Sequence, residues 1–112
     1  MDELDGVIAA PGIHAVLFEN DEVRVVETRI EVGERTPLHT HLAPTVNYVL
    51  SGSHFVRRDE AGEVVLDTRA VPGFVMPRVL WSETLGRHTL ENAGDDPIVI
   101  IGAELKHPSG GA

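Results

Sequence analysis

Two histidines, His39 and His41, are separated by a single residue in the segment G-E-R-T-P-L-H-T-H that starts at Gly33. Residues two apart in an extended strand point to the same face, so both imidazoles can bind one metal ion. The pair by itself is a weak indication, because two histidines near a loop are more often ordinary polar surface residues. The rest of the chain must therefore supply the context.

The elements that must position these side chains are predicted to be β-strands. Runs rich in Val, Ile and Thr alternate with turn formers such as Asp59-Glu60-Ala61-Gly62, and no window shows a helical period of apolar residues. Pro77 interrupts one run, which predicts an edge or bulged strand there. We expect strands at residues 22–32, 45–50, 54–58, 63–68, 74–76 with 79–81, 87–91 and 98–105, forming one closed all-β domain.

Size and composition exclude several classes of protein. With 112 residues the chain fits a single core, and 18 acidic against 9 basic residues argue against a nucleic-acid partner. The absence of cysteine excludes disulfides and thiolate metal sites. The acidic N-terminus does not resemble a signal peptide, and no apolar run is longer than the four residues Ile98 to Ile101, which are too few to span a bilayer. We therefore expect a cytoplasmic protein with no membrane partner.

The spacing around the histidine pair resembles the first motif of the cupin superfamily. That motif has a glycine, five residues, H-x-H, three or four residues, a glutamate, six residues and a glycine. Gly33, the two histidines and Gly52 occupy the matching positions, and Thr45 stands where the glutamate is expected. The second cupin motif ends in a histidine, three residues and an asparagine, which Arg87-His88-Thr89-Leu90-Glu91-Asn92 reproduces. Its upstream proline and glycine are not at the usual spacing.

The resemblance implies a double-stranded β-helix, the jelly-roll barrel of RmlC-like cupins. It implies a single domain over residues 1–112, with a core at about 22–106, an N-terminal arm at 1–10 and a flexible tail at 107–112. In cupins the motif histidines and the glutamate converge on one divalent metal inside the barrel. Carried over to this chain, the ligands are His39, His41 and His88, with Thr45 in the fourth place.

Thr45 has two interpretations. Its hydroxyl is neutral and its side chain is shorter than that of glutamate, so the metal would be bound by three histidines only. The ion would then keep its full charge and favour an anionic ligand. Some cupins lack the glutamate, including the thiol dioxygenases. Alternatively, the metal site has been lost and Thr45 only packs in its strand. Glu83 could offer a substitute carboxylate from a loop, although acids on such loops usually face water.

Three more residues are candidates for contacts with a substrate or a subunit. Asn47 alternates with Thr45 onto the same face of the strand, so both can contact a substrate; Asn47 can orient a bound molecule or satisfy the barrel backbone. Trp81 can wall the mouth of the pocket, or pack in the core or against a second subunit. Tyr48, in the opposite phase, is expected to pack between sheets or at a subunit contact.

Other polar residues match no motif position. His14, His54 and His107 are expected at the surface, and Arg57-Arg58 beside Asp59-Glu60 is interpreted as a solvated charged turn, not a binding patch.

Two functions remain open from sequence. The first is a metal-binding cupin that acts on a small, anionic organic molecule, dioxygenase-like if the metal is iron; Zn, Fe, Ni and Mn are not distinguished. The alternative is a non-catalytic cupin that binds a small ligand without stoichiometric metal. The resemblance and the apolar segment Val7 to Ala10 suggest a homodimer, because a short barrel has strand edges to cover. The specific reaction is not predicted.

Overall fold

The computed structural model of the protein describes residues 12–41, 43–83 and 85–106, and strands make up almost all of its regular structure. The elements are β1 (His14–Glu19), β2 (Val23–Ile30), β3 (His39–His41), β4 (Thr45–Ser51), β5 (Phe55–Asp59), β6 (Val64–Asp67), the 3-10 turn η1 (Thr68–Ala70), β7 (Val79–Ser82), β8 (Leu85–Asn92) and β9 (Ile98–Leu105).

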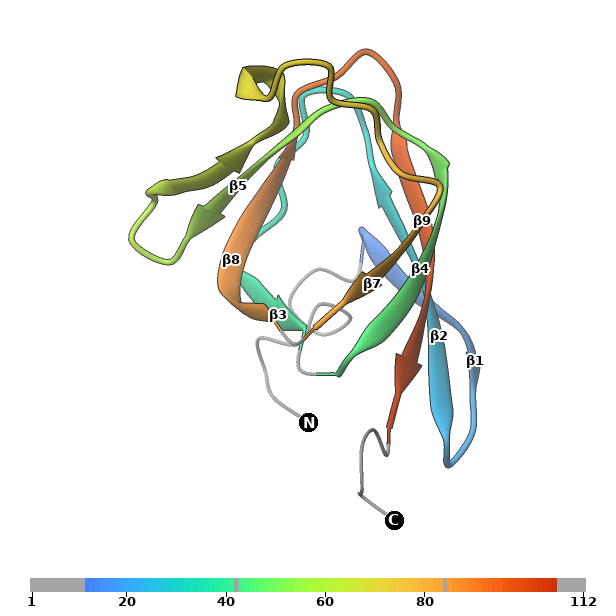
Figure 1. Ribbon diagram of the computed structural model, residues 1–112. Helices are drawn as coiled ribbons and strands as arrows, with labels where there is room; N and C mark the ends of the chain where they lie inside the picture. The colour runs from blue at the N-terminus through green and yellow to red at the C-terminus, as the bar shows by residue number, and fades with distance from the viewer. Residues whose placement is uncertain (1–11, 42, 84, 107–112) are drawn as a thin grey trace.

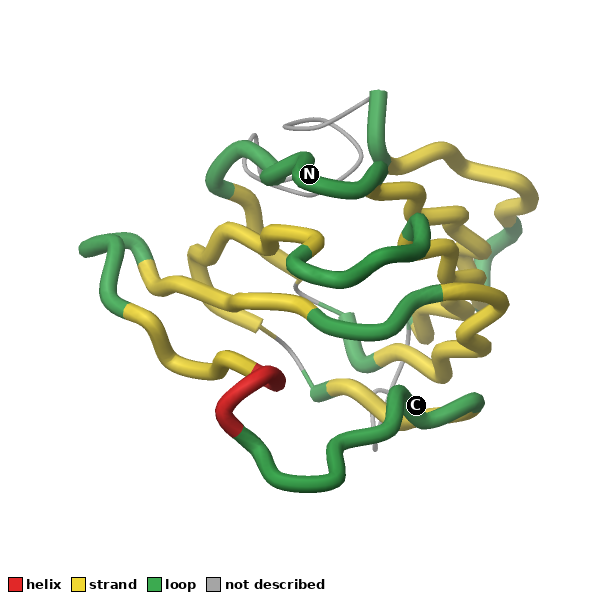
Figure 2. The backbone as a smooth tube through the Cα atoms, turned by 90° about the horizontal axis from the view of Figure 1, so that it is seen from above, coloured by secondary structure: helices red, strands yellow, loops and turns green. Residues whose placement is uncertain are grey.

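The strands form two antiparallel sheets that face each other as the walls of a barrel (Figure 1). The first sheet has the order β1-β2-β9-β4-β7 and the second the order β3-β8-β5-β6. The longest pairing joins β2 to β9, with Val23 opposite Leu105 at one end and Ile30 opposite Ile98 at the other. The turn η1 lies at the periphery, after β6 (Figure 2). The all-β jelly-roll architecture predicted from sequence is confirmed.

The interior is divided between a small apolar core and a polar region. Strand alternation turns Val26 and Ile30 inward, and Val56 and Ile98 complete the set of fully buried apolar residues in the described part of the chain. Buried polar residues are more numerous and include three histidines, four threonines, an asparagine, an arginine and a glutamate. Buried polar groups need partners, and most of these side chains also line the cavity between the sheets or pair with residues that do.

Asn92, the last residue of the second motif, ties β8 to its neighbours. Its side-chain amide donates to the carbonyl oxygens of Ile30 at 2.9 Å and Asp96 at 2.8 Å. Its side-chain oxygen accepts a hydrogen bond from the backbone N–H of Gly94 at 3.0 Å. Asn92 is 1% exposed, so these bonds are shielded from water. They fix the end of the strand that carries His88.

Most of the predicted strands match observed ones, but β3 was not among them and the predicted segment 74–76 is not a strand. Only the part after Pro77 forms a strand, β7, which lies at the edge of its sheet as predicted. Strand β1 was not predicted, and it begins at His14, eight residues before the expected core start at Glu22. The expected arm at 1–10, the segment Val7 to Ala10, His107 and the tail at 107–112 lie outside the described residues.

In the part described, no helix has the length and apolar character needed to cross a membrane.

Candidate metal centre and ligand cavity

A cavity of about 370 Å³ lies between the two sheets. One part of the cavity wall is apolar, and another part consists of titratable side chains. The apolar part includes Ile30, Phe55, Leu66, Phe74, Leu90, Ile98 and Ile100, and the titratable side chains are His14, His39, His41, His88, Arg57 and Glu104.

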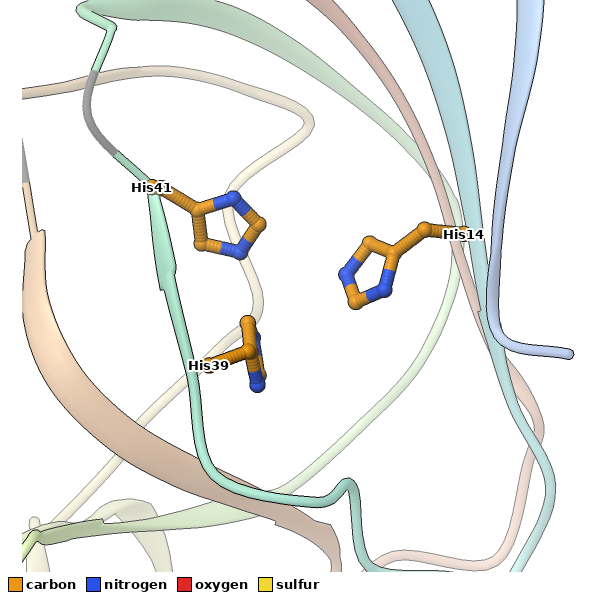
Figure 3. A group of neighbouring side chains, drawn as sticks. All are labelled: His14, His39 and His41. Atoms are coloured by element: carbon orange, nitrogen blue, oxygen red, sulfur yellow. The ribbon is translucent and has the colours of Figure 1, made fainter. Parts of the chain in front are cut away.

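Three histidines form a compact group that bridges the sheets. His14 projects from β1, and His39 and His41 project from β3 toward it (Figure 3). One potential ligand atom from each residue lies within 4.8 Å of those of the other two. The ring centroids of His39 and His41 are 4.8 Å apart, and that of His14 lies 5.0 and 5.3 Å from them. The expectation of a surface position for His14 is wrong, because this residue is 2% exposed.

His88 flanks this group from β8. It pairs with His39 across the strands, and the two ring centroids lie 4.4 Å apart. The centroid of His88 is 5.5 Å from that of His41. The structure thus brings together the three sequence-predicted histidines and adds His14, which sequence reasoning placed elsewhere. The compact group defined by ligand-atom distances contains His14 and not His88, so the role of His88 as a ligand stays a prediction.

Hydrogen bonds to backbone carbonyls orient two of the rings. Nδ1 of His39 lies 2.8 Å from the carbonyl oxygen of Pro37 and 3.3 Å from Oγ1 of Thr36. Nδ1 of His88 lies 2.7 Å from the carbonyl oxygen of Gly86. A carbonyl oxygen only accepts, so these contacts assign the proton to Nδ1 and leave the Nε2 lone pair available. Metal-binding histidines are commonly oriented in this way.

Burial keeps the imidazoles of His41 and His88 neutral. It lowers the pKa of His41 to about 2, and the neighbouring His39, His14 and His88 rings and Arg24 lower it further. Burial also lowers the pKa of His88 to about 4, against an opposing contribution from the hydrogen bond to Gly86. Neutral imidazole is the form that binds a metal, so both residues are ready to do so at neutral pH. The donor set therefore fits a divalent transition-metal ion.

Thr45, which occupies the position of the motif glutamate, forms a hydrogen bond to a nearby backbone carbonyl. Thr45 is 8% exposed, and its hydroxyl donates to the carbonyl oxygen of Ala43 at 3.0 Å. Gly102 lies close to it on β9, where an added Cβ would come within 2.9 Å of Cγ2 of Thr45 and 3.0 Å of Oδ1 of Asn47. The amide of Asn47 lines the cavity and donates to Oγ of Ser82 at 2.9 Å.

A buried carboxylate is present on the strand next to Thr45. Glu104 lies opposite Thr45 on β9 and also lines the cavity. Arg24, its partner across β2, contacts Oε1 of Glu104 through Nε and Nη2, both at 2.7 Å. The side chains are only 7% and 10% exposed. The guanidinium balances the charge of this carboxylate, so the pair adds little net charge to the cavity.

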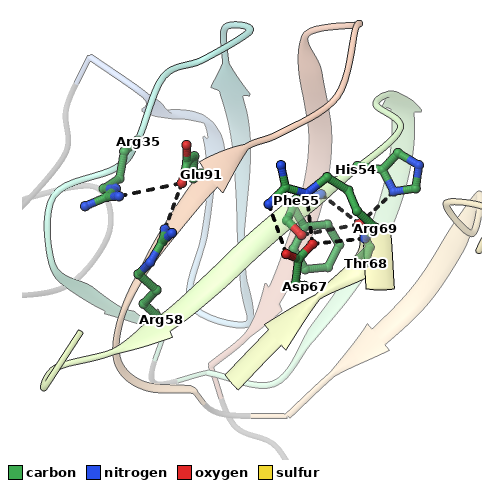
Figure 4. Close-up of polar contacts among 8 residues, drawn as sticks. All are labelled: Arg35, His54, Phe55, Arg58, Asp67, Thr68, Arg69 and Glu91. Carbon is green, nitrogen blue, oxygen red and sulfur yellow. Dashed lines mark hydrogen bonds and ion pairs between the residues drawn. The ribbon is translucent and has the colours of Figure 1, made fainter. Parts of the chain in front are cut away.

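The other sequence candidates lie on the outer face. Trp81 is 50% exposed and points away from Leu80 and Ser82, its neighbours in β7 that line the cavity. Its indole N–H donates to Oε1 of Glu83 at 2.9 Å, and Glu83 is exposed, as acids on such loops usually are. Tyr48 is 43% exposed on the outside of β4. His54 is half-buried, with Nδ1 2.9 Å from Oγ1 of Thr68 (Figure 4).

Arg57 corrects a further expectation. The structure places its side chain in the lining of the cavity, whereas Arg58 bonds to Glu91 at 2.8 Å outside it (Figure 4). The dipeptide is therefore not simply a solvated charged turn. Strand alternation explains the difference, since neighbouring residues in β5 point to opposite faces.

Solved structures similar to this one are cupins. A cupin domain from Bordetella pertussis Tohama I is 21% identical, with a TM-score of 0.65 over 84% of this chain and 92% of that one. An RmlC-like cupin family protein from Methanocaldococcus jannaschii is 12% identical, with a TM-score of 0.60 over 86% and 81%. A Klebsiella pneumoniae protein with a double-stranded β-helix domain is 19% identical, with a TM-score of 0.59 over 88% and 79%. No protein-family model and no curated protein sequence matches the chain.

Proposed function

We propose that this chain, which has the cupin fold, binds one divalent metal ion and holds or transforms a small organic anion beside it. The observation that carries the proposal is the group of three imidazole ligands within 4.8 Å of one another. We assign His14, His39 and His41 as ligands and retain His88 as a fourth, because its ring centroid lies only 4.4 Å from that of His39. When bound, such an ion supplies Lewis acidity, and iron would also allow dioxygen chemistry.

The rest of the site would orient the small molecule. Asn47 presents a side-chain amide to the cavity, and the pairing of Glu104 with Arg24 leaves the neutral imidazoles as donors of the centre. An ion bound only by neutral ligands keeps its dipositive charge, which favours an anion even in a protein with a net charge of −9.

Titration of the metal-free protein tests the proposal. We expect one equivalent each of Zn²⁺, Ni²⁺ or, under anaerobic conditions, Fe²⁺ to bind in competition with a chromophoric chelator, with Mn²⁺ weakest. Elemental analysis of protein purified without an affinity tag would identify the resident metal. Failure of all four ions to bind stoichiometrically would contradict the proposal and favour the non-catalytic ligand-binding cupin, which the large apolar part of the cavity also supports.

We also propose a homodimer formed through the outer face of β4 and β7. Val46, Tyr48, Leu50, Val79 and Trp81 are between 43% and 57% exposed there, and β7 leaves a sheet edge open. A second copy would cover this apolar surface and the edge. Light scattering should give twice the chain mass of 12.1 kDa. Val46→Glu should give the monomer mass, and a wild-type monomer at high concentration would exclude the dimer.

A further inference from the structure

We propose that Arg57 binds the carboxylate of an organic acid whose apolar body occupies the cavity between the sheets. The inference names the ligand class and a binding residue for the site proposed above, and it rests on that proposal only for the role of the neighbouring metal. The carboxylate contact itself requires no metal, so the two can be tested separately.

The sheet register places Arg57 among apolar side chains. It lies opposite Leu90 on β8 and Leu66 on β6. Residues directly opposite one another share a face, and both leucines line the cavity with Arg57. The guanidinium carbon lies 5.7 Å from the centre of the Phe55 ring. A cation thus stands in a mostly hydrocarbon wall.

Arg57 has no acidic partner among the described residues. Its Nε is buried and makes no hydrogen bond in the part of the chain that the structure describes. Several other arginines are paired, among them Arg24 with Glu104, Arg58 with Glu91, and Arg69 with Asp67. Arg57 as a whole is half-buried; a partly desolvated cation without a compensating charge is costly, and such groups are retained where they serve a function. Burial also lowers the pKa of Arg57, in keeping with a desolvated site.

A carboxylate would supply the negative charge and hydrogen-bond acceptors that the guanidinium of Arg57 lacks. The planar guanidinium donates two parallel N–H groups to a carboxylate, and the bond strengthens where water is excluded. The cavity that Arg57 lines is also lined by Phe55, Phe74, Leu66 and Ile98, which suit an aliphatic or aromatic body better than a polar one. The ligand class is therefore a small monocarboxylic acid with an apolar body.

The same position links Arg57 to the histidines. His88 lies two residues before Leu90 on the same face of β8, so Arg57 and His88 are on neighbouring strands of one wall. The charge of Arg57 also contributes to lowering the pKa of His88. An acid held by Arg57 would present its remaining atoms to the histidine group from inside the cavity.

The test compares Arg57→Met with Arg58→Met in metal-free protein. Methionine keeps an unbranched apolar stem and removes only the charge and the donors. Arg58 is the matched control, because it is the next residue of β5, carries the same charge and pairs with Glu91 outside the cavity. Calorimetric titration with benzoate, and with its neutral counterpart benzamide, measures the contribution of the carboxylate.

We expect wild type and Arg58→Met to bind benzoate at least tenfold more tightly than benzamide, and Arg57→Met to bind both equally weakly. We also expect Arg57→Met to unfold at the same temperature as wild type or higher, since Arg57 makes no ion pair with the described residues and methionine keeps its apolar stem. Equal affinity of wild type for benzoate and benzamide, undetectable binding of both, or retention of the preference in Arg57→Met would overturn the inference. Because no metal is present, these results are independent of the metal titration.

Discussion

His14→Ala is expected to lower the affinity of the protein for Zn²⁺ by at least about 100-fold. The substitution removes one of three imidazoles whose ligand atoms lie within 4.8 Å of one another. Outer-shell partners of metal ligands are alone worth 10–100-fold in affinity, so the loss of a ligand should exceed this range. Competition with a chelator of known affinity measures the change.

His54→Ala is the matched control for this experiment. It also removes an imidazole, but one that contacts Thr68 and the ring of Phe74 away from the histidine group. Its metal affinity should equal that of wild type. If His88→Ala abolishes binding while His14→Ala leaves it intact, the ligands are the three expected from the cupin resemblance, and His14 only packs beside them. Circular dichroism of each variant establishes that the barrel is folded.

Arg24→Met is expected to lower the free energy of unfolding by about 3–5 kcal/mol. The substitution leaves Glu104 inside the barrel without the guanidinium that now contacts it at 2.7 Å. Removing one member of a buried ion pair is costly because the remaining charge stays desolvated. Urea denaturation followed by circular dichroism measures the difference between the variant and the wild type.

The matched control is Arg29→Met on the same strand. Arg29 pairs with Glu31 at a similar distance of 2.8 Å, but the two side chains are 54% and 56% exposed. Its loss should cost less than about 1 kcal/mol. Adding Glu104→Gln to Arg24→Met should recover part of the stability, because it removes the buried charge. A loss as small in Arg24→Met as in Arg29→Met would show that Glu104 is adequately solvated or neutralised without Arg24.

The fold was predictable because its signals are local. Turn formers separate short runs of β-formers, and the spacing from Gly33 to Gly52 fixes where the H-x-H pair sits relative to the next strand. The proline at position 77 correctly indicated an edge strand. These features depend on residues near one another in the chain, so they can be read without knowledge of the sheet order.

The full candidate site was not predictable in the same way. His14 lies 25 positions before His39, in a strand that no motif marks, and only the sheet arrangement brings the two rings within 5.0 Å. Arg57 was grouped with its charged neighbours because sequence alone did not reveal which side chains of β5 face inward. Alternation puts Arg57 on the same face as Phe55 and opposite to Val56, but only the sheet arrangement shows that the face of Phe55 and Arg57 lines the cavity.

The bridging position of the three histidines has a consequence for the lifetime of the protein. A metal ion held between β1 and β3 would join the two walls of the barrel, so separating them would require its release. At a free metal concentration 100 times the dissociation constant, this linkage contributes about 2.7 kcal/mol. Transient opening would then become about a hundred times rarer, and with it cleavage by proteases that attack the open chain. Metal supply would thereby set how long each molecule survives.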